Sequence, residues 1–297
     1  MTYRVIAMAA LLGSASTLHA GGIDRSGQSI TALFESGRYA EFSLGSVSPN
    51  TSGVGAGPAS PVTPTPGANS GNMTDNFFTF GAAYKADIND QLSYAIIYDQ
   101  PFGADVEYPT GTGYFAQGST AEFNSHALTG LLRYKMPNNF SVHGGIRVQT
   151  IEASAVIPFI ANYSVDGDRD TGVGYVAGVA YEKPEIALRV SLTYNSKISY
   201  DVRTSENSLI GSNVTETEVE TPQSVNLEFQ TGVAADTLVF GGVRWVDWSS
   251  FEIAPNDYST LTGGGKLLSY EDDVYTYSLG VGRRLSDTWS VAASVGY

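Results

Sequence analysis

The sequence predicts an all-β fold, a transmembrane antiparallel β-barrel, and three observations support this. Segments that alternate apolar and polar residues recur about eleven times between residue 39 and the end of the chain. The connections between these segments are alternately short and long. No stretch of the chain reaches the ~20 apolar residues that a membrane-spanning helix needs, so any membrane span must be a strand.

The composition narrows the possible functions. The chain has 297 residues, a net charge of -14 and no cysteine. An acidic excess argues against nucleic acid as a partner, and the lack of cysteine excludes disulfides and thiolate metal sites. The 33 glycines and 18 tyrosines are typical of a β-protein with tight turns and aromatic residues at a membrane interface.

Residues 1–20 predict a secretory signal peptide. Arg4 precedes an apolar stretch from Val5 to Leu12, and small and polar residues follow up to Ala20. This order is that of a signal peptide, and the apolar run is too short for a membrane anchor. We therefore expect cleavage after Ala20 and export of the remaining chain.

The alternating segments are the predicted strands, and several reach ten residues or more, longer than the usual ~5–6. In one of them Phe140 and Ile146 share a face, whereas His143 and Arg147 share the other. The polar faces are rich in Ser, Thr, Gly and Asn, and Tyr and Trp lie near the strand ends. This distribution fits a barrel with a polar interior and aromatic belts at both membrane surfaces. A single strand is expected across residues 185–202.

The connections predict the two ends of the barrel. The tight turns are ADIND, PNN, KP, AAD and SD. The long polar or Pro/Gly-rich connections are residues 49–75, 101–121, 158–171, 204–222 and 252–272. Regular alternation of this kind is typical of periplasmic turns and extracellular loops, and is not expected of a β-sandwich.

The odd number of predicted strands indicates that the barrel is incomplete. A chain whose residue 21 starts in the periplasm sends its first strand outward, and its eleventh strand, residues 288–297, then also runs outward. Closed single-chain barrels have an even number of strands, and unpaired backbone groups in lipid cost several kcal/mol each. We therefore expect a C-terminal truncation and a gap between the first and last strands. The competing interpretation is that the terminal aromatic Tyr297 closes a complete barrel.

Three stretches resemble the FadL-type (OmpP1/FadL/TodX) outer-membrane transporters of long-chain fatty acids and aromatic hydrocarbons. They are QPFGADVEY, DTGVGYVAGVAYEKPEIALRVSLTYNSKISYDV and TPQSVNLEFQTGVAADTLVFGGVRWVDWSSFE. The last contains the W-S-x-F pattern of the family at Trp248, Ser249 and Phe251. The resemblance covers most of the chain from Gly21 on. It implies a monomeric barrel of about fourteen strands, inserted by the outer-membrane assembly machinery, that admits hydrophobic compounds passively.

The resemblance also implies that residues 21–38 fold into the lumen as a hatch, so that residues 39–297 form the barrel. Ile30, Leu33 and Phe34 have helical spacing and suit anchoring to the barrel wall. Leu33 and Phe34 are also candidate ligand contacts. The segment is short for the family, and the Asn-Pro-Ala motif common in its hatch is absent.

A transporter of hydrophobic molecules needs an apolar pocket and apolar loop tips, not reactive groups. Further candidate substrate contacts in the long connections are Phe102, Ile157, Phe159, Ile160, Leu209 and Ile210. The alternative interpretation of residues 156–160 is the exposed end of a lipid-facing strand. The alternative interpretation of Leu209 and Ile210 is that they form a small local core within their loop.

Charged residues on the polar faces include Arg147, Arg189 and Arg244, which are candidate contacts for a ligand carboxylate. The alternative is a structural network that holds the hatch, because charges inside a barrel need partners. The run VDGDRD has calcium-loop spacing but lacks the required Gly and Glu at the later positions. Neither a metal nor a cofactor is predicted.

Catalysis is not predicted. The chain beyond residue 20 has only His126 and His143, and no G-x-S-x-G motif. Ser125 beside His126 points to the opposite side of its strand. The sequence thus predicts passive uptake of hydrophobic compounds, without deciding between fatty acids and aromatic hydrocarbons. The alternative is a non-transporting structural or adhesin barrel, or a general porin.

Overall fold

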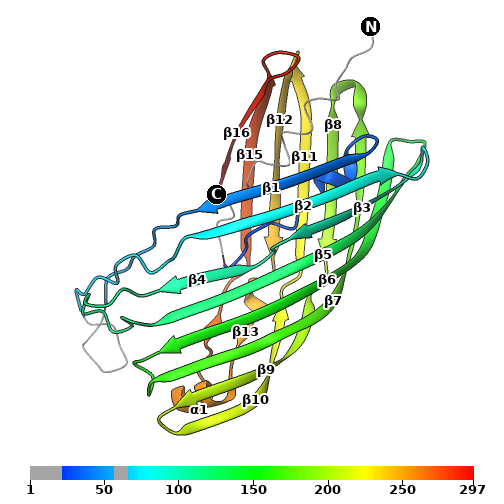
Figure 1. Cartoon of the computed structure of the whole chain (residues 1–297). Coiled ribbons are helices and arrows are strands. Elements are labelled where there is room, and N and C mark those ends of the chain that lie inside the picture. The colour runs from blue at the N-terminus through cyan, green and yellow to red at the C-terminus, as the bar shows by residue number, and fades with distance from the viewer. Residues whose placement is uncertain (1–21, 57–65) are drawn as a thin grey trace.

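The computed structural model describes residues 22–56 and 66–297, so the predicted signal peptide lies outside the described residues. Eleven strands form one antiparallel wall in the order β1-β2-β3-β5-β6-β7-β8-β11-β12-β15-β16 (Figure 1). The predicted antiparallel barrel wall of about eleven strands is therefore confirmed. Among the described residues no helix is long and apolar enough to cross a membrane.

The wall strands are β1 (Tyr39–Val47), β2 (Phe77–Asp87), β3 (Leu92–Asp99), β5 (Thr120–Lys135), β6 (Phe140–Ile157), β7 (Tyr163–Lys183), β8 (Leu188–Asn195), β11 (Ser224–Ala234), β12 (Thr237–Val246), β15 (Val274–Arg284) and β16 (Ser290–Gly296). Outside this path, β4 (Gly103–Glu107) pairs with β5, and β9 (Ile198–Ser208) pairs with β10 (Gly211–Thr221) and with β7. The short elements are β13 (Glu252–Ile253), β14 (Leu268–Ser269), α1 (Asn256–Thr262) and the 3-10 turns η2 (Thr31–Phe34), η3 (Pro184–Ile186) and η4 (Trp248–Ser250).

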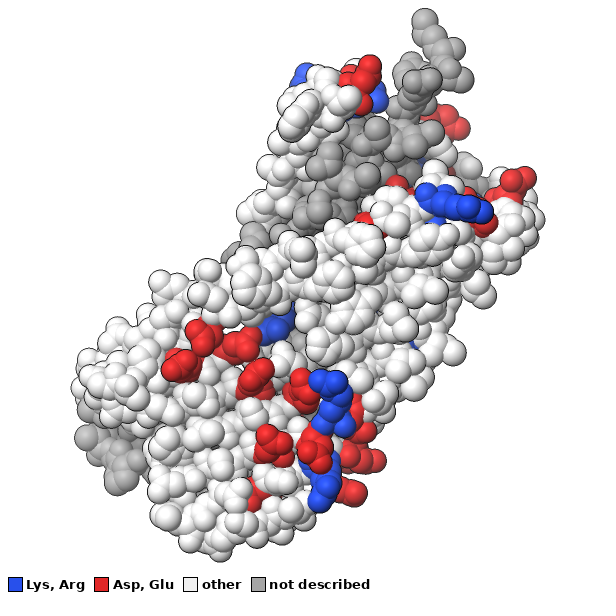
Figure 2. Space-filling model, in the orientation of Figure 1, with Lys and Arg blue, Asp and Glu red and all other residues white. Residues whose placement is uncertain are grey.

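The two faces of the wall are segregated as their alternation predicts. On β6, Ile146 is 61% exposed on the outside, whereas the adjacent Arg147 is 3% exposed on the inside. Charged side chains gather near the two ends of the molecule and leave an uncharged band between them (Figure 2). An apolar outer band and a polar interior are the pattern of a barrel surrounded by lipid.

The N-terminal segment, residues 22–38, lies against the inner face of the wall. Its turn η2 buries Leu33 completely and Phe34 almost completely. These residues form a cluster with side chains from β2, β3, β5 and β7, namely Ala83, Ala95, Ile97, Leu131, Val176 and Ala180. The helical spacing of Ile30, Leu33 and Phe34 therefore produces one 3-10 turn that packs on the wall.

Short and long connections lie at opposite ends of the wall, as expected (Figure 1). Two of the expected long loops, however, are wrong. The loop expected at residues 158–171 is a tight turn, because β6 and β7 continue to pair as far as Ile157 and Tyr163. The loop expected at residues 204–222 is mostly the β9–β10 hairpin.

The single strand expected across residues 185–202 is also wrong. It breaks after Asn195, where β8 ends, and resumes at Ile198 as β9. The apolar positions change sides at this break: Leu192 on β8 is exposed, whereas Tyr200 on β9 is 2% exposed and packs in the interior. β9 thus turns its apolar face inward and leaves the lipid-facing band.

The edges of the wall are β1 and β16, which do not pair with each other in the described part of the chain. The expected gap between the first and last strands is therefore present. Tyr297 exchanges backbone hydrogen bonds with Tyr277, with N–O distances of 2.8 and 2.9 Å. Because Tyr277 stands near the start of β15, Tyr297 lies away from the short turns.

Candidate functional site

A cavity of about 750 Å³ lies inside the wall at the end that carries the long connections. Its sides come from β4, β5, β6 and β10, its floor from residues 22–25, and part of its roof from α1. The aromatic side chains that line it include Phe77, Phe115, Phe123, Phe159, Tyr258 and Tyr270. A volume of this size falls within the range of small-molecule sites, roughly 300–1,000 Å³.

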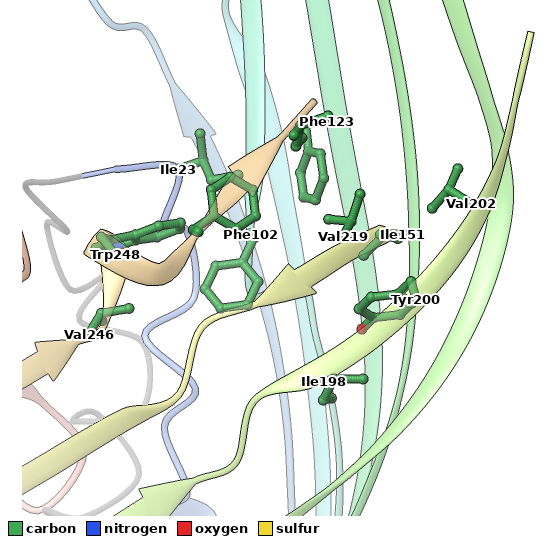
Figure 3. Close-up of a cluster of buried hydrophobic side chains, with 12 residues drawn as sticks. Ile23, Phe102, Phe123, Ile151, Ile198, Tyr200, Val202, Val219, Val246 and Trp248 are labelled. Carbon is green, nitrogen blue, oxygen red and sulfur yellow. The ribbon is translucent and has the colours of Figure 1, made fainter. Parts of the chain in front are cut away.

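An apolar cluster underlies the cavity, with side chains that converge from β5, β9, β10 and the segment after β12 (Figure 3). Trp248, which is fully buried, packs edge-on against Phe102 and Phe251, with ring centroids 5.6 and 5.3 Å apart. Gly22 has a φ of +60°, and a side chain there would overlap the indole. This cluster fixes the start of the N-terminal segment.

Backbone hydrogen bonds join the N-terminal segment to the wall. The Gly103 N–H donates to the Ile23 carbonyl, and the Arg25 N–H donates to the Pro101 carbonyl, each at 2.8 Å. Strand β3 ends at Asp99 and β4 begins at Gly103. The backbone groups of the residues around this interruption can therefore pair with the N-terminal segment. The residues that form the cavity floor are therefore attached to the wall by side-chain packing and by backbone hydrogen bonds.

Arg244 holds the floor from below. Its Nε donates to Asp24 Oδ2 at 2.6 Å, and its terminal nitrogens donate to Ser224, Asn226 and Gln28 at 2.8–3.1 Å. Both members of the Arg244–Asp24 ion pair are nearly buried. Arg244 thus contacts the N-terminal segment through two of its residues and does not line the cavity.

Arg25 forms a second ion pair within the cavity lining. Its Nη2 donates to Asp105 Oδ2 at 2.5 Å, and its guanidinium carbon lies 4.1 Å from the centre of the Phe77 ring. Gly103 leaves the space for this guanidinium, since a side chain there would overlap it. The sequence reasoning missed this pair, although Asp105 lies in the family-like stretch QPFGADVEY.

The cavity brings together only two of the predicted substrate contacts, Ile157 and Phe159. The Phe159 ring lies 5.0 Å from that of Phe115, in an edge-to-face arrangement. Ile160 packs beside the same wall without lining the cavity, and Phe102 is buried below the floor. Leu33 and Phe34 lie in the separate cluster around η2.

Leu209 and Ile210 form the tip of the β9–β10 hairpin and are 75% and 62% exposed. They therefore lie at the surface of the hairpin and do not line the cavity. A role for them, and for the other predicted contacts, stays a prediction.

The remaining predicted arginines also lie outside the 750 Å³ cavity. Arg147 is buried, and its Nε donates to Thr129 at 2.9 Å. Arg189 lines a second cavity of about 440 Å³, together with Glu228. The guanidiniums of Arg189 and Arg133 lie 4.9 and 4.6 Å from the centre of the Phe34 ring.

The roof is held by Glu206, which is 1% exposed. Its carboxylate accepts hydrogen bonds from the backbone N–H groups of Asp257 and Tyr258, at 3.0 and 3.1 Å, and from the Tyr163 hydroxyl at 2.7 Å. Tyr258 also packs edge-on against Tyr163. One carboxylate on β9 thus joins the hairpin and β7 to the first residues of α1.

Within the described residues, no group of three or more His, Asp or Glu side chains is placed to hold a metal ion. Asp170, from the run with calcium-loop spacing, instead accepts hydrogen bonds from the backbone N–H groups of Thr171 and Asp201.

The family model described as outer membrane protein transport protein (OMPP1/FadL/TodX) matches residues 32–297. No curated protein matches the chain. A solved structure of a Pseudomonas aeruginosa FadL homologue is similar, with a TM-score of 0.66 and 16% identity over 97% of this chain and 79% of that one.

The Ralstonia pickettii toluene transporter TbuX gives a TM-score of 0.60 and 12% identity over 90% of this chain and 79% of that one. The Pseudomonas putida toluene transporter TodX gives a TM-score of 0.59 and 14% identity over 97% of this chain and 78% of that one. These likenesses establish the fold. Because the family model covers most of its length, the chain belongs to the OMPP1/FadL/TodX family of outer-membrane transport proteins.

Proposed function

We propose that the protein takes up hydrophobic compounds passively, with the 750 Å³ cavity as the site where the compound is held. Membership of this family makes the protein an outer-membrane β-barrel transporter of Gram-negative bacteria, not an enzyme. The observation that carries the proposal is an aromatic-lined cavity at the end of a lipid-facing barrel, with a floor made from a separate segment.

The proposed route begins at the apolar tip of the β9–β10 hairpin, Leu209 and Ile210. These exposed side chains give a hydrophobic compound a first contact above the membrane. The compound then enters the cavity beside Phe159, and it leaves downward when residues 21–38 shift as a hatch. The protein acts as a monomer, inserted by the outer-membrane assembly machinery among outer-membrane lipids.

The substrate is proposed as a long-chain fatty acid or an aromatic hydrocarbon. Two of the similar structures are named as toluene transporters, and the third as a FadL homologue. A cavity of about 750 Å³ has room for either class. The alternative of a structural or adhesin barrel, or a general porin, has less support, because neither requires an aromatic-lined cavity bounded below by a separate segment.

Equilibrium binding of radiolabelled 1-decanol to the refolded protein tests the proposal. We expect Phe159→Asp to weaken binding by about 100-fold, since an unpaired carboxylate in an apolar site costs several kcal/mol. Val233→Asp is the matched control, because Val233 is an exposed residue near the β11–β12 turn. Absence of 1-decanol binding to the unsubstituted protein would overturn the proposed function.

A further inference from the structure

We propose that Ala153, beside the floor of the 750 Å³ cavity, sets the length limit for a hydrophobic ligand, and that this limit lies above ten carbons. The inference rests on the proposed function, because it concerns the ligand of the same cavity. It makes Ala153 a residue that determines specificity, and it assigns the cavity to compounds much larger than a single aromatic ring.

The cavity is large for a one-ring compound. An apolar cavity of about 150 Å³ holds one benzene molecule, which corresponds to roughly 25 Å³ for each carbon atom. At that density the volume of about 750 Å³ has room for roughly 30 carbons. A compound with one ring would touch only a small part of the lining, and the rest of the lining would gain no dispersion energy from it.

The cavity is also deep. On β6 its lining extends from residue 151 to residue 157, and at a rise of about 3.4 Å per residue this distance is roughly 20 Å. Phe159, in the turn after β6, continues the lining outward. The floor lies at the other end, because the Ile23 carbonyl accepts its hydrogen bond from the N–H of Gly103, next to Ala104. A ligand that fills this space is therefore elongated along β6.

A row of small residues crosses the wall at the level of the floor. Ala153 stands opposite Phe123 in the β5–β6 pairing, and Phe123 stands opposite Ala104 in the β4–β5 pairing. Phe123 is buried in the inner cluster, and directly opposite strand residues share a face, so both alanines point into the lumen. On its other side Ala153 is paired with Gly167, which has no side chain. The wall beside the floor is therefore low, and it leaves the bottom of the cavity open to a ligand.

Ala153 is the position in this row where added volume would enter the cavity. It lines the cavity and is only partly buried, whereas its neighbours Phe123 and Ile151 are 4% and 2% exposed. A larger side chain at residue 153 can keep the backbone pairing of β6 and extend into the open space. It would then occupy the place of the far end of a long ligand.

The experiment measures equilibrium binding of 1-alkanols of about six to about eighteen carbons to the refolded protein, with the free alcohol determined in the aqueous phase. Each added methylene should raise the affinity about fourfold for as long as the chain finds room. In the unsubstituted protein we expect this rise to continue beyond ten carbons before it levels off. In Ala153→Leu, three added carbons should move the levelling-off point about three carbons shorter.

Two further variants make the shift specific. Ala153→Val adds a smaller side chain and should shorten the limit by about two carbons. Ala293→Leu is the matched control, because Ala293 is exposed on β16 and stands opposite the exposed Val281. This control should keep the original limit. 1-Octanol should still bind to Ala153→Leu, which separates a shorter limit from a lost site.

The outcomes distinguish this inference from the proposed function. A rise that levels off at ten carbons or fewer in the unsubstituted protein overturns the length limit and leaves the proposed function intact. The same holds if the folded Ala153→Leu and Ala153→Val variants both keep the original limit. Absence of binding of every alcohol to the unsubstituted protein overturns both proposals.

Discussion

At the scale of single residues, Phe34 shows how the N-terminal segment is held at the end opposite the cavity. The guanidinium carbons of Arg133 and Arg189 lie 4.6 and 4.9 Å from the centre of its ring, and the His143 ring is perpendicular to it with the ring centres 5.7 Å apart. An aromatic face attracts cations, so one ring stabilises two like charges in a small space. Arg133 is further paired with Glu182.

Glu35, the next residue, makes this attachment sensitive to pH. Burial raises the pKa of the Glu35 carboxyl above its ordinary value, and the positive charge of Arg189 opposes the shift only in part. Because the pKa is higher in the folded state, the stabilisation is complete below the unfolded pKa and is lost as the pH rises through the folded pKa. We expect the backbone amides of residues 30–37 to exchange hydrogen more slowly near pH 4 than near pH 7, after correction for intrinsic rates.

The matched variant for this prediction is Glu35→Gln, which has no titrating group and should exchange to the same corrected extent at both pH values. Slower corrected exchange of the unsubstituted segment at the higher pH would contradict the prediction.

At the scale of elements, the sequence was informative wherever lipid faced one side of a strand. Alternation placed Phe140, Ile146, His143 and Arg147 on the correct faces of β6. It failed where strands leave the lipid, because alternation alone does not distinguish a lipid-facing apolar side from an inward-packed one. The break between β8 and β9 is such a place.

The candidate site was less predictable than the wall, for a physical reason. Ile157 and Phe159 could be found because apolar residues in a polar connection are a local signal. Arg25 and Asp105 lie 80 residues apart in the chain, and their pairing depends on where the N-terminal segment meets β4. No local pattern specifies such a contact.

The apolar band gives a prediction about depth in the membrane. Ile146 lies within the lipid-facing part of β6, whereas Ser154 stands on the same outward face beyond the band. We expect Ile146→Arg to destabilise the barrel by about 2–4 kcal/mol and Ser154→Arg by about 0–1 kcal/mol, because the cost of a cation depends on its depth. Urea unfolding in lipid vesicles measures both values, and equal losses would show that the band is misplaced.

At the scale of the whole molecule, the barrel has two differently filled halves. The half with the short turns contains η2 and a network of buried polar residues, and the half with the long connections contains the cavity. We propose that the long connections, at the end that carries the cavity, face the cell exterior.

This orientation can be tested with single cysteines, since the natural chain has none. Leu209→Cys, at the hairpin tip, should react with a membrane-impermeant maleimide on intact cells. Val233→Cys, near the β11–β12 turn, should react only after the outer membrane is permeabilised. The reverse pattern of labelling would show that the barrel is inserted the other way.

The Glu206 carboxylate has a consequence for how fast the cavity exchanges its contents. It joins the hairpin to α1 through bonds that do not involve the ligand. We expect a ligand that exchanges between the cavity and the cell exterior to pass beneath α1 while these bonds are open, whereas its downward exit depends on the N-terminal segment. A contact that slows both directions equally leaves the dissociation constant unchanged and lengthens the residence time. We therefore expect substitution of Glu206 to change the rate at which the cavity fills and empties on its outer side more than its equilibrium occupancy.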